Sequence, residues 1–124
     1  MLEFRSVMLF SENPGKLAEF YKEVFQKEPD WKDNGYFGFT VGSGFLMIGP
    51  HDKVHGKSIN PERIMFNFEA NDVVSEFKRI NKLEVKVVAE PYYPGKDDDM
   101  WIATFADPDG NYFQLTTPWN NGVN

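Results

Sequence analysis

TFADPDGNYFQL, residues 104–115, is the stretch of sequence that decides the fold. Its apolar and aromatic residues predict two strands, at residues 100–106 and 111–117, because such side chains suit a pleated, half-buried surface. DPDG at residues 107–110 predicts the turn between them, since Asp side chains accept hydrogen bonds from nearby backbone N–H groups. We therefore expect a β-hairpin in this part of the chain.

Upstream of this hairpin, the order strand, helix, strands occurs twice. The first copy begins with a strand at residues 4–10 and an amphipathic helix at Pro14–Gln26, where apolar residues recur every three or four positions. Strands at residues 36–41 and 44–48 follow, and a shorter strand is expected near Trp31.

The second copy has the same order and ends in the hairpin. A strand at residues 63–69 precedes a helix capped by Asn71 or Asp72, and residues 83–90 alternate like a strand. A repeat of about 60 residues is too small to bury its apolar face alone, so the two copies must pack together or pair with another chain.

The polar segment between the copies predicts a linker. We expect a single domain over residues 1–124, with a first module at about 1–50, a linker at about 51–62 and a second module at about 63–119.

The composition excludes several kinds of site and partner. The chain has 124 residues, no cysteine and two histidines. Thiol nucleophiles, disulfides, Cys-based zinc sites and an all-His metal triad are therefore excluded. The formal net charge of -6 argues against nucleic acid or an anionic membrane as a partner. No targeting segment and no apolar run near the roughly 20 residues of a membrane span is found, so a cytoplasmic location is expected.

Three stretches resemble the vicinal-oxygen-chelate superfamily, which includes glyoxalase I, extradiol dioxygenases, fosfomycin-modifying enzymes and bleomycin-resistance proteins. They are ENPGKLAEFYKEVF at residues 12–25, RIMFNFEANDV at residues 63–73 and TFADPDGNYFQL. The resemblance implies an α+β fold in which two βαβββ modules form a curved eight-stranded mixed sheet around a cavity, with the helices outside. Members of the superfamily often dimerise, so a homodimer is expected.

The alternation of each strand then assigns side chains to the two faces of the sheet. The residues expected to face the helices are Val7, Leu9, Ile64, Phe66, Phe68, Phe113 and Leu115. The residues expected to bind a ligand in the cavity are Ser6, Met8, Phe10, Phe45, Met47, Met65, Asn67, Glu69, Trp101, Tyr112 and Gln114. Trp31, Trp101 and Trp119 lie at strand ends or in loops, where a flat side chain often borders a pocket.

The residues at the family's metal positions do not suit a divalent ion. The resemblance places ligands on the first and last strand of each module, and these positions hold Ser6, Met47, Met65 and Gln114. Only Gln114 is a plausible ligand, because Ser is a poor donor and Met suits soft ions. We therefore expect no metal and no cofactor.

Other polar residues allow two interpretations each. His51 and His55 lie in a Gly- and Pro-containing segment, which predicts solvated loop histidines, although a loop folded over the cavity would let one of them touch a ligand. Glu69 is a candidate general base, or a carboxylate at the rim of the sheet. The run Asp97–Asp99 predicts a solvated loop.

Several functions fit these residues. The first hypothesis is a glyoxalase/bleomycin-resistance-like protein without the usual metal site, which binds a small aromatic or cationic organic molecule. The second is a glyoxalase-like lyase or other enzyme with altered, possibly metal-independent chemistry, in which Glu69 is the base and Asn67 or Gln114 holds a substrate oxygen. The third is a non-catalytic dimeric scaffold. Whether the protein is an enzyme stays open.

Overall fold

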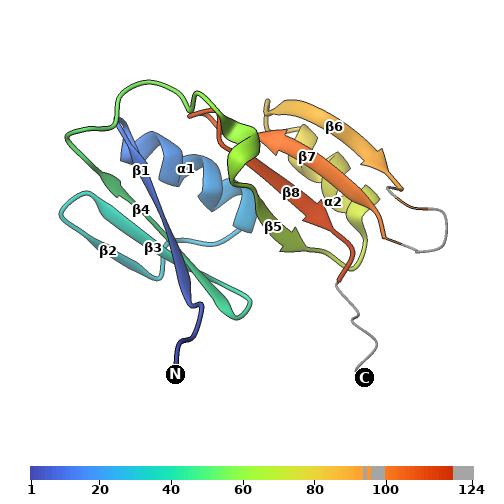
Figure 1. The fold of residues 1–124 in the computed structure, drawn as a ribbon, viewed down its shortest axis with the longest axis horizontal. Coiled ribbons are helices and arrows are strands. Elements are labelled where there is room, and N and C mark those ends of the chain that lie inside the picture. The colour runs from blue at the N-terminus through green and yellow to red at the C-terminus, as the bar shows by residue number, and fades with distance from the viewer. Residues whose placement is uncertain (94, 96–99, 119–124) are drawn as a thin grey trace. The chain divides into compact units, whose positions relative to one another are not determined.

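The structure is a computed structural model that describes residues 1–93, 95 and 100–118. The chain divides into two compact units, Met1–Lys57 and Ser58–Asn124. Each unit has its own four-stranded sheet (Figure 1). The boundary between the units falls inside the expected linker.

The first unit has the order βαβββ. Its elements are β1 (Ser6–Ser11), α1 (Pro14–Phe25), β2 (Trp31–Asp33), β3 (Tyr36–Val41) and β4 (Gly44–Pro50). The strands are arranged in the order β1-β4-β3-β2, with β1 parallel to β4 and the other pairs antiparallel.

The second unit repeats this order after a short turn of 3₁₀-helix. Its elements are η1 (Pro61–Arg63), β5 (Phe66–Glu69), α2 (Val73–Asn81), β6 (Lys86–Tyr92), β7 (Ile102–Ala106) and β8 (Tyr112–Thr116). The strand order is β5-β8-β7-β6, with β5 parallel to β8. The predicted α+β class with two βαβββ modules is confirmed. Among the helices of the described residues, none is long and apolar enough to cross a membrane.

The core of the first unit lies between α1 and one face of its sheet. Asn13 caps α1 by accepting a hydrogen bond from the Lys16 N–H, and Pro14 stands at the start of the helix. The buried side chains of the helix are Leu17, Ala18, Tyr21 and Val24, and those of the strands are Leu9, Phe39, Leu46 and Ile48. Burying each of these larger apolar side chains contributes about 1.5–3 kcal/mol to folding.

The core of the second unit is a stack of aromatic rings beneath α2. Phe77 on the helix stacks on Phe105 with 5.1 Å between ring centroids, and Phe105 stacks on Phe113 at 5.5 Å. Phe105 and Phe113 are completely buried. The side chains of Phe113 and Leu115 therefore lie on the helix-covered face of the sheet, as the alternation of β8 predicts.

Ile64 was expected in this core, and that prediction is wrong. The side chain of Ile64 is 67% exposed. Pro61 begins the 3₁₀ turn, so pairing of β5 with β8 starts only at Phe66, which is opposite Phe113. Ile64 and Met65 thus precede the strand and do not follow its alternation.

The turn at residues 107–110 is built by Asp107. Its Oδ1 accepts hydrogen bonds from the backbone N–H groups of Asp109 and Asn111, both at 2.9 Å. Its Oδ2 accepts a third bond from the Asn111 side chain at 3.0 Å. The Asp107 side chain is buried, so these bonds replace the water that the carboxylate loses on folding.

The exposed carboxylates of Asp30 and Asp72 make the free energy of unfolding depend on pH in the acid range. The Lys27 ammonium lowers the pKa of Asp30 below its ordinary value of 3.8, and the Ser75 N–H lowers the pKa of Asp72 in the same way. A depressed pKa in the folded state stabilises the protein above the ordinary value, and this contribution is lost as pH falls through the lowered pKa. We expect the urea midpoint to be constant above about pH 5 and to fall below about pH 4. D30N should reduce this acid dependence; an unchanged dependence in D30N would contradict the assignment.

Candidate functional site

In the first unit, the face of the sheet opposite α1 carries the predicted site residues Ser6, Met8, Phe10, Phe45 and Met47. We call it the platform. The buried residues Leu9, Phe39, Leu46 and Ile48 face the helix, so alternation puts their neighbours on the platform. The platform residues are Ser6, Met8, Phe10, Trp31, Asp33, Tyr36, Gly38, Thr40, Phe45, Met47 and Gly49.

The strand register brings apolar platform residues from all four strands into one row. Met8 on β1 is opposite Met47 on β4, which is opposite Gly38 on β3, which in turn is opposite Trp31 on β2. Met8 and Trp31 are each almost half exposed, at 46% and 45%. Large apolar side chains in contact with water on one face form a surface suited to an organic ligand.

Two glycines let aromatic rings lie across the platform. A Cβ at Gly38 would coincide with the ring of Phe45, and a Cβ at Gly49 would coincide with the ring of Tyr36. The two rings therefore occupy the space that the Cβ atom of any other residue at positions 38 and 49 would need. This arrangement resembles the aromatic covering of strand glycines that pins register in sheets.

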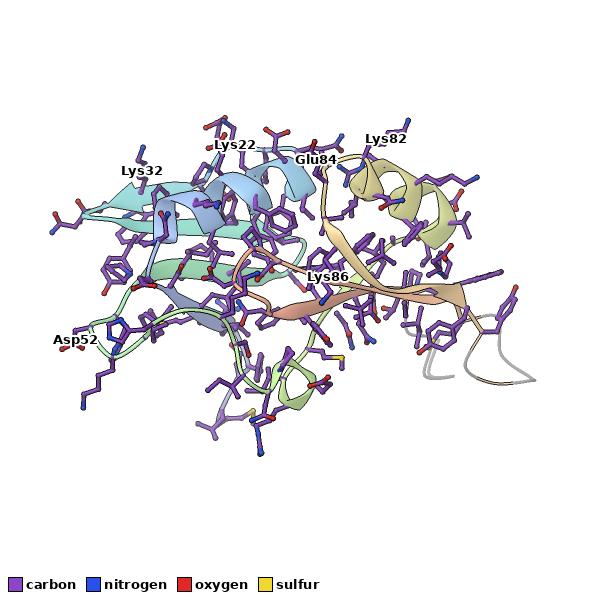
Figure 2. All side chains as sticks on the ribbon, turned by 90° about the horizontal axis from the view of Figure 1, so that it is seen from above. Lys22, Lys32, Asp52, Lys82, Glu84 and Lys86 are labelled. Atoms are coloured by element: carbon purple, nitrogen blue, oxygen red, sulfur yellow. The ribbon has the colours of Figure 1, made fainter. Side chains whose placement is uncertain are left out.

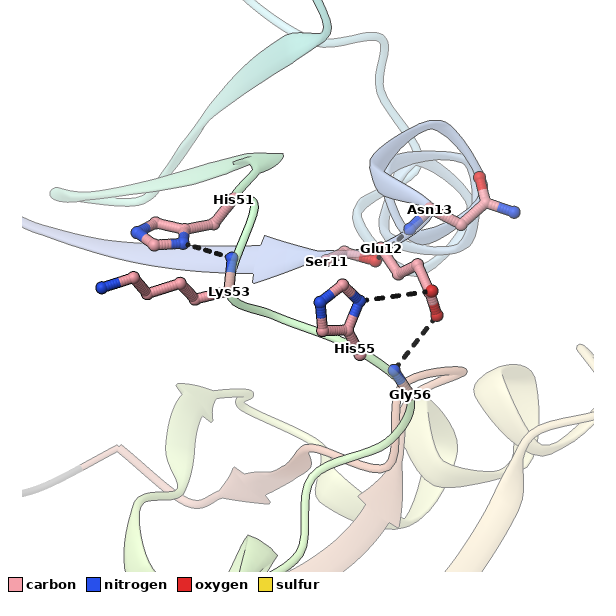
Figure 3. A network of polar contacts seen from close by, with 7 residues as sticks. All are labelled: Ser11, Glu12, Asn13, His51, Lys53, His55 and Gly56. Atoms are coloured by element: carbon pink, nitrogen blue, oxygen red, sulfur yellow. Dashed lines mark hydrogen bonds and ion pairs between the residues drawn. The ribbon is translucent and has the colours of Figure 1, made fainter.

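His51 follows β4 and touches the platform. Its ring makes an edge-to-face contact with Phe10, with 5.1 Å between centroids and an angle of 73°. The Lys53 N–H donates a hydrogen bond to His51 Nδ1 at 3.1 Å (Figure 3). Since a nitrogen that accepts a hydrogen bond carries no proton, this arrangement describes a neutral imidazole. The structure thus brings one of the two histidines into contact with a predicted site residue.

His55 belongs to a different contact. Its Nδ1 lies 3.6 Å from a carboxylate oxygen of Glu12, whose other oxygen accepts a hydrogen bond from the Gly56 N–H at 3.1 Å (Figure 3). The Gly56 N–H is the main cause of a lowered pKa of Glu12, and His55 adds to it. This network ties the segment after β4 to the end of β1.

Two oppositely charged side chains of the first unit lie on opposite sides of its sheet. Lys32 lies on the helix side of the sheet, with its Nζ 5.7 Å from the centre of the Phe37 ring, whereas Asp52 lies on the opposite side (Figure 2). Asp33 shares the platform row of Tyr36. Carboxylates and the negative faces of aromatic rings both favour a positively charged ligand.

In the second unit, the corresponding open face is polar. Asn67 on β5 is opposite Gln114 on β8, and Gln114 is opposite Thr104 on β7. The Gln114 Nε2 donates a hydrogen bond to Thr104 Oγ1 at 3.0 Å. Glu69 follows Asn67 on the same face and is opposite Thr116. This face therefore presents amide and carboxylate groups that can hydrogen-bond a polar ligand.

The residues expected at the metal positions, from the resemblance, are a poor set of donors. Met47 lies in the platform row, Met65 precedes β5, and the Gln114 amide nitrogen is bound to Thr104. Thioether sulfur and one neutral amide oxygen do not fit the hard divalent ions that O and N ligands hold. Within the described part of the chain, no group of three or more His, Asp or Glu residues gathers as a metal site would require.

Two further predicted site residues belong to the second unit. Trp101 precedes β7 and contacts Tyr93 with the rings tilted by 41° and 4.0 Å between centroids. Tyr112 lies two residues before Gln114 on the same face of β8 and is opposite Ala106. Trp119 and Asp97–Asp99 lie outside the described residues. Tyr36, Gly38 and Gly49 were not among the predicted site residues. Because Phe39 faces the helix, alternation puts Gly38 and then Tyr36 on the opposite face, and counting onward by twos from Met47 reaches Gly49.

These two units with their open faces match a known family. A model of the Glyoxalase/Bleomycin resistance protein/Dioxygenase superfamily matches residues 4–115. The chain belongs to this superfamily. Comparison with curated protein sequences gives no match.

Solved structures of the same fold are only distantly similar in sequence. A glyoxalase-related enzyme from Fulvimarina pelagi superposes with a TM-score of 0.74 at 14% identity, over 95% of this chain and 89% of that chain. A glyoxalase/bleomycin resistance protein/dioxygenase family enzyme from Burkholderia phytofirmans PsJN gives 0.74 at 15% identity, over 94% and 98% of the two chains. TioX from Micromonospora sp. ML1 gives 0.70 at 15% identity, over 94% and 98%. At these identities the likeness shows the fold alone.

Proposed function

We propose that this protein binds a small aromatic or cationic organic molecule on the platform and does so without the divalent metal of the superfamily. The observation that carries the proposal is the pair of aromatic rings laid over glycines, Phe45 over Gly38 and Tyr36 over Gly49. Such a surface offers ring faces for stacking on a planar ligand, because each strand glycine leaves the neighbouring ring room to lie across it.

Both the shape and the charge of this surface support the proposal. Each favourable aromatic contact contributes about 0.5–1.5 kcal/mol beyond burial, and a cation over a ring adds about 0.5–2 kcal/mol. Met8 and Met47 add flexible, polarizable side chains that adapt to ligands of different shape. The net charge of -6 would attract a cation over longer distances.

A titration with cationic aromatic antibiotics tests the proposal. We expect the tryptophan fluorescence to change on binding, because Trp31 lies in the platform row. The W31F variant should lose most of the fluorescence response while calorimetry still detects binding. The matched control is W101F, which changes a tryptophan of the other unit. If no compound of the panel binds, the proposed function is wrong; if W101F rather than W31F removes the response, the platform is not the site.

A glyoxalase-like enzyme with altered chemistry is the second candidate. It is supported by the register that places Asn67 opposite Gln114, with Glu69 next along the same face. In this reading Glu69 accepts a proton from the substrate and the amides hold a substrate oxygen. Metal analysis discriminates the two candidates, because a stoichiometric divalent ion in the purified protein would favour the enzyme and contradict metal-free binding. The homodimer stays a prediction in either case.

A further inference from the structure

His51 lies at one end of the platform, and its Nδ1 atom is close to two different partners. Its Nδ1 accepts the hydrogen bond from the Lys53 N–H at 3.1 Å. The same Nδ1 lies 3.4 Å from a carboxylate oxygen of Asp52. A neutral ring can accept from Lys53, whereas a protonated ring must donate and can pair only with Asp52. Protonation therefore exchanges a backbone hydrogen bond for an ion pair.

The ring of His51 lies close to the place where a ligand would stack. It contacts Phe10, and Phe10 is opposite Gly49, across which the ring of Tyr36 lies. Phe10, Tyr36 and His51 thus gather around one glycine from β1, β3 and the segment after β4. A charge on the imidazole would be close to a ligand that stacks on Phe10, because the two ring centroids are 5.1 Å apart.

We propose that His51 determines the charge specificity of the platform: neutral His51 allows an aromatic cation to bind, and protonated His51 disfavours that cation and favours an aromatic anion. This inference rests on the proposed function, since it concerns the same surface. Histidine is suited to this role because its charge changes between about pH 5 and pH 8.

The other ionisable groups around His51 come from each neighbouring element. Asp52 and Lys53 belong to its own segment, Asp33 is opposite Tyr36 on the platform, and Glu12, which follows β1, contacts His55. The carboxylates stay charged and Lys53 stays protonated between about pH 5 and pH 8, as the ordinary pKa values of these residue types require. Histidine is the residue type whose charge changes over this interval, so substitution of His51 and of His55 in turn separates their contributions.

The direction of the effect follows from Coulomb's law. Asp33, Asp52 and Lys53 keep their charges over this interval, so the change in binding follows the charge of the imidazole. Adding one positive charge at the imidazole is expected to weaken binding of a cation by about three- to ten-fold and to strengthen binding of an anion by a similar factor, at a separation of about 5 Å in a dielectric close to that of water, because the side chain is exposed to solvent.

Two naphthalene probes of opposite charge test the inference. Binding of 1-naphthylmethylammonium and of 1-naphthoate is measured by calorimetry at about pH 5.5 and about pH 8, where both probes keep their charge. We expect the affinity of the cation to fall and that of the anion to rise on acidification. H51N, which places a polar side chain that does not titrate, should remove both shifts. H55N is the matched control, because His55 contacts Glu12 rather than the platform, and it should retain them.

The outcomes separate the two proposals. Opposite shifts that persist in H55N and vanish in H51N support the role of His51. If either probe binds and H51N responds to pH as the unaltered protein does, or if both probes shift in the same direction, the role of His51 is excluded while the platform stands. If neither probe binds at either pH, the platform itself is excluded as a binding surface for aromatic ions, and the role of His51 with it.

Discussion

Replacing Asp107 by alanine is expected to lower the free energy of unfolding by about 2–4 kcal/mol, because the carboxylate is buried and several donors would lose their acceptor. Those donors are the backbone N–H groups of Asp109 and Asn111 and the Asn111 side chain. The turn they form joins β7 to β8, and the register of this pair aligns Phe105 with Phe113 in the core. Urea denaturation of D107A against the unaltered protein measures the loss.

The same turn supplies the control for this prediction. Asp109 Oδ2 is buried and has no hydrogen-bond partner, so D109A removes a desolvated oxygen that contributes nothing by bonding. We expect D109A to change stability by less than about 1 kcal/mol. D107N, which keeps one acceptor oxygen, should fall between the two. Equal losses in D107A and D109A would show that the Asp107 hydrogen bonds do not hold the turn.

Replacing Gly49 by alanine is expected to lower the affinity for an aromatic ligand at least about ten-fold and stability by about 1–3 kcal/mol. The added methyl group would occupy space held by the Tyr36 ring, so the ring must leave the platform. Calorimetry with a bound ligand from the panel and urea denaturation measure the two effects separately. Loss of stability with unchanged affinity would place the binding surface elsewhere.

A matched control and a compensating variant sharpen this experiment. Gly44 begins the same strand, and a Cβ there would meet only the Val41 carbonyl oxygen at an ordinary 3.6 Å, so G44A should be close to neutral. Removing the ring as well, in Y36A/G49A, should cost less stability than the sum of the two single changes, because the clash is gone. Additive losses would mean that the ring and the glycine do not share this space.

Local patterns alone predicted most of the elements. The spacing of apolar residues predicted α1 to within one residue, because a helix repeats on a short period and Asn13-Pro14 marks its start. The strand near Trp31 was less well defined, although Asn34-Gly35 carries a strong hairpin signal. Both residues adopt positive φ, at 53° and 85°, as the tight turn between β2 and β3 requires.

Errors occurred where an element boundary depends on neighbours in space. The strand expected at residues 83–90 is found at Lys86–Tyr92. It continues through Pro91 because β6 is at the edge of its sheet and needs fewer backbone donors. β6 also has two register shifts against β7, which no periodic pattern shows. Ile64 was misplaced for a similar reason, since the start of β5 is set by its pairing with β8.

For the candidate site, the sequence by itself determined which side chains share a face and how few metal-binding groups the chain contains. Alternation placed Met8, Phe10, Phe45 and Met47 together, because successive side chains of a strand point to opposite sides. The resemblance to the superfamily, and not the alternation, identified Met47 and Met65 as standing where ligands are expected. The shared face needs only the residue order and the period of a strand.

Only the tertiary structure decided which side chains of the platform are neighbours. The strand register places Gly38 between Met47 and Trp31. In the folded sheet the Tyr36 ring lies across Gly49. The ring of His51 contacts Phe10. These neighbours are up to 41 residues apart in the chain, His51 and Phe10 being the most distant. No local pattern joins them, because the alignment of one strand with the next depends on the packing of the whole sheet against its helix.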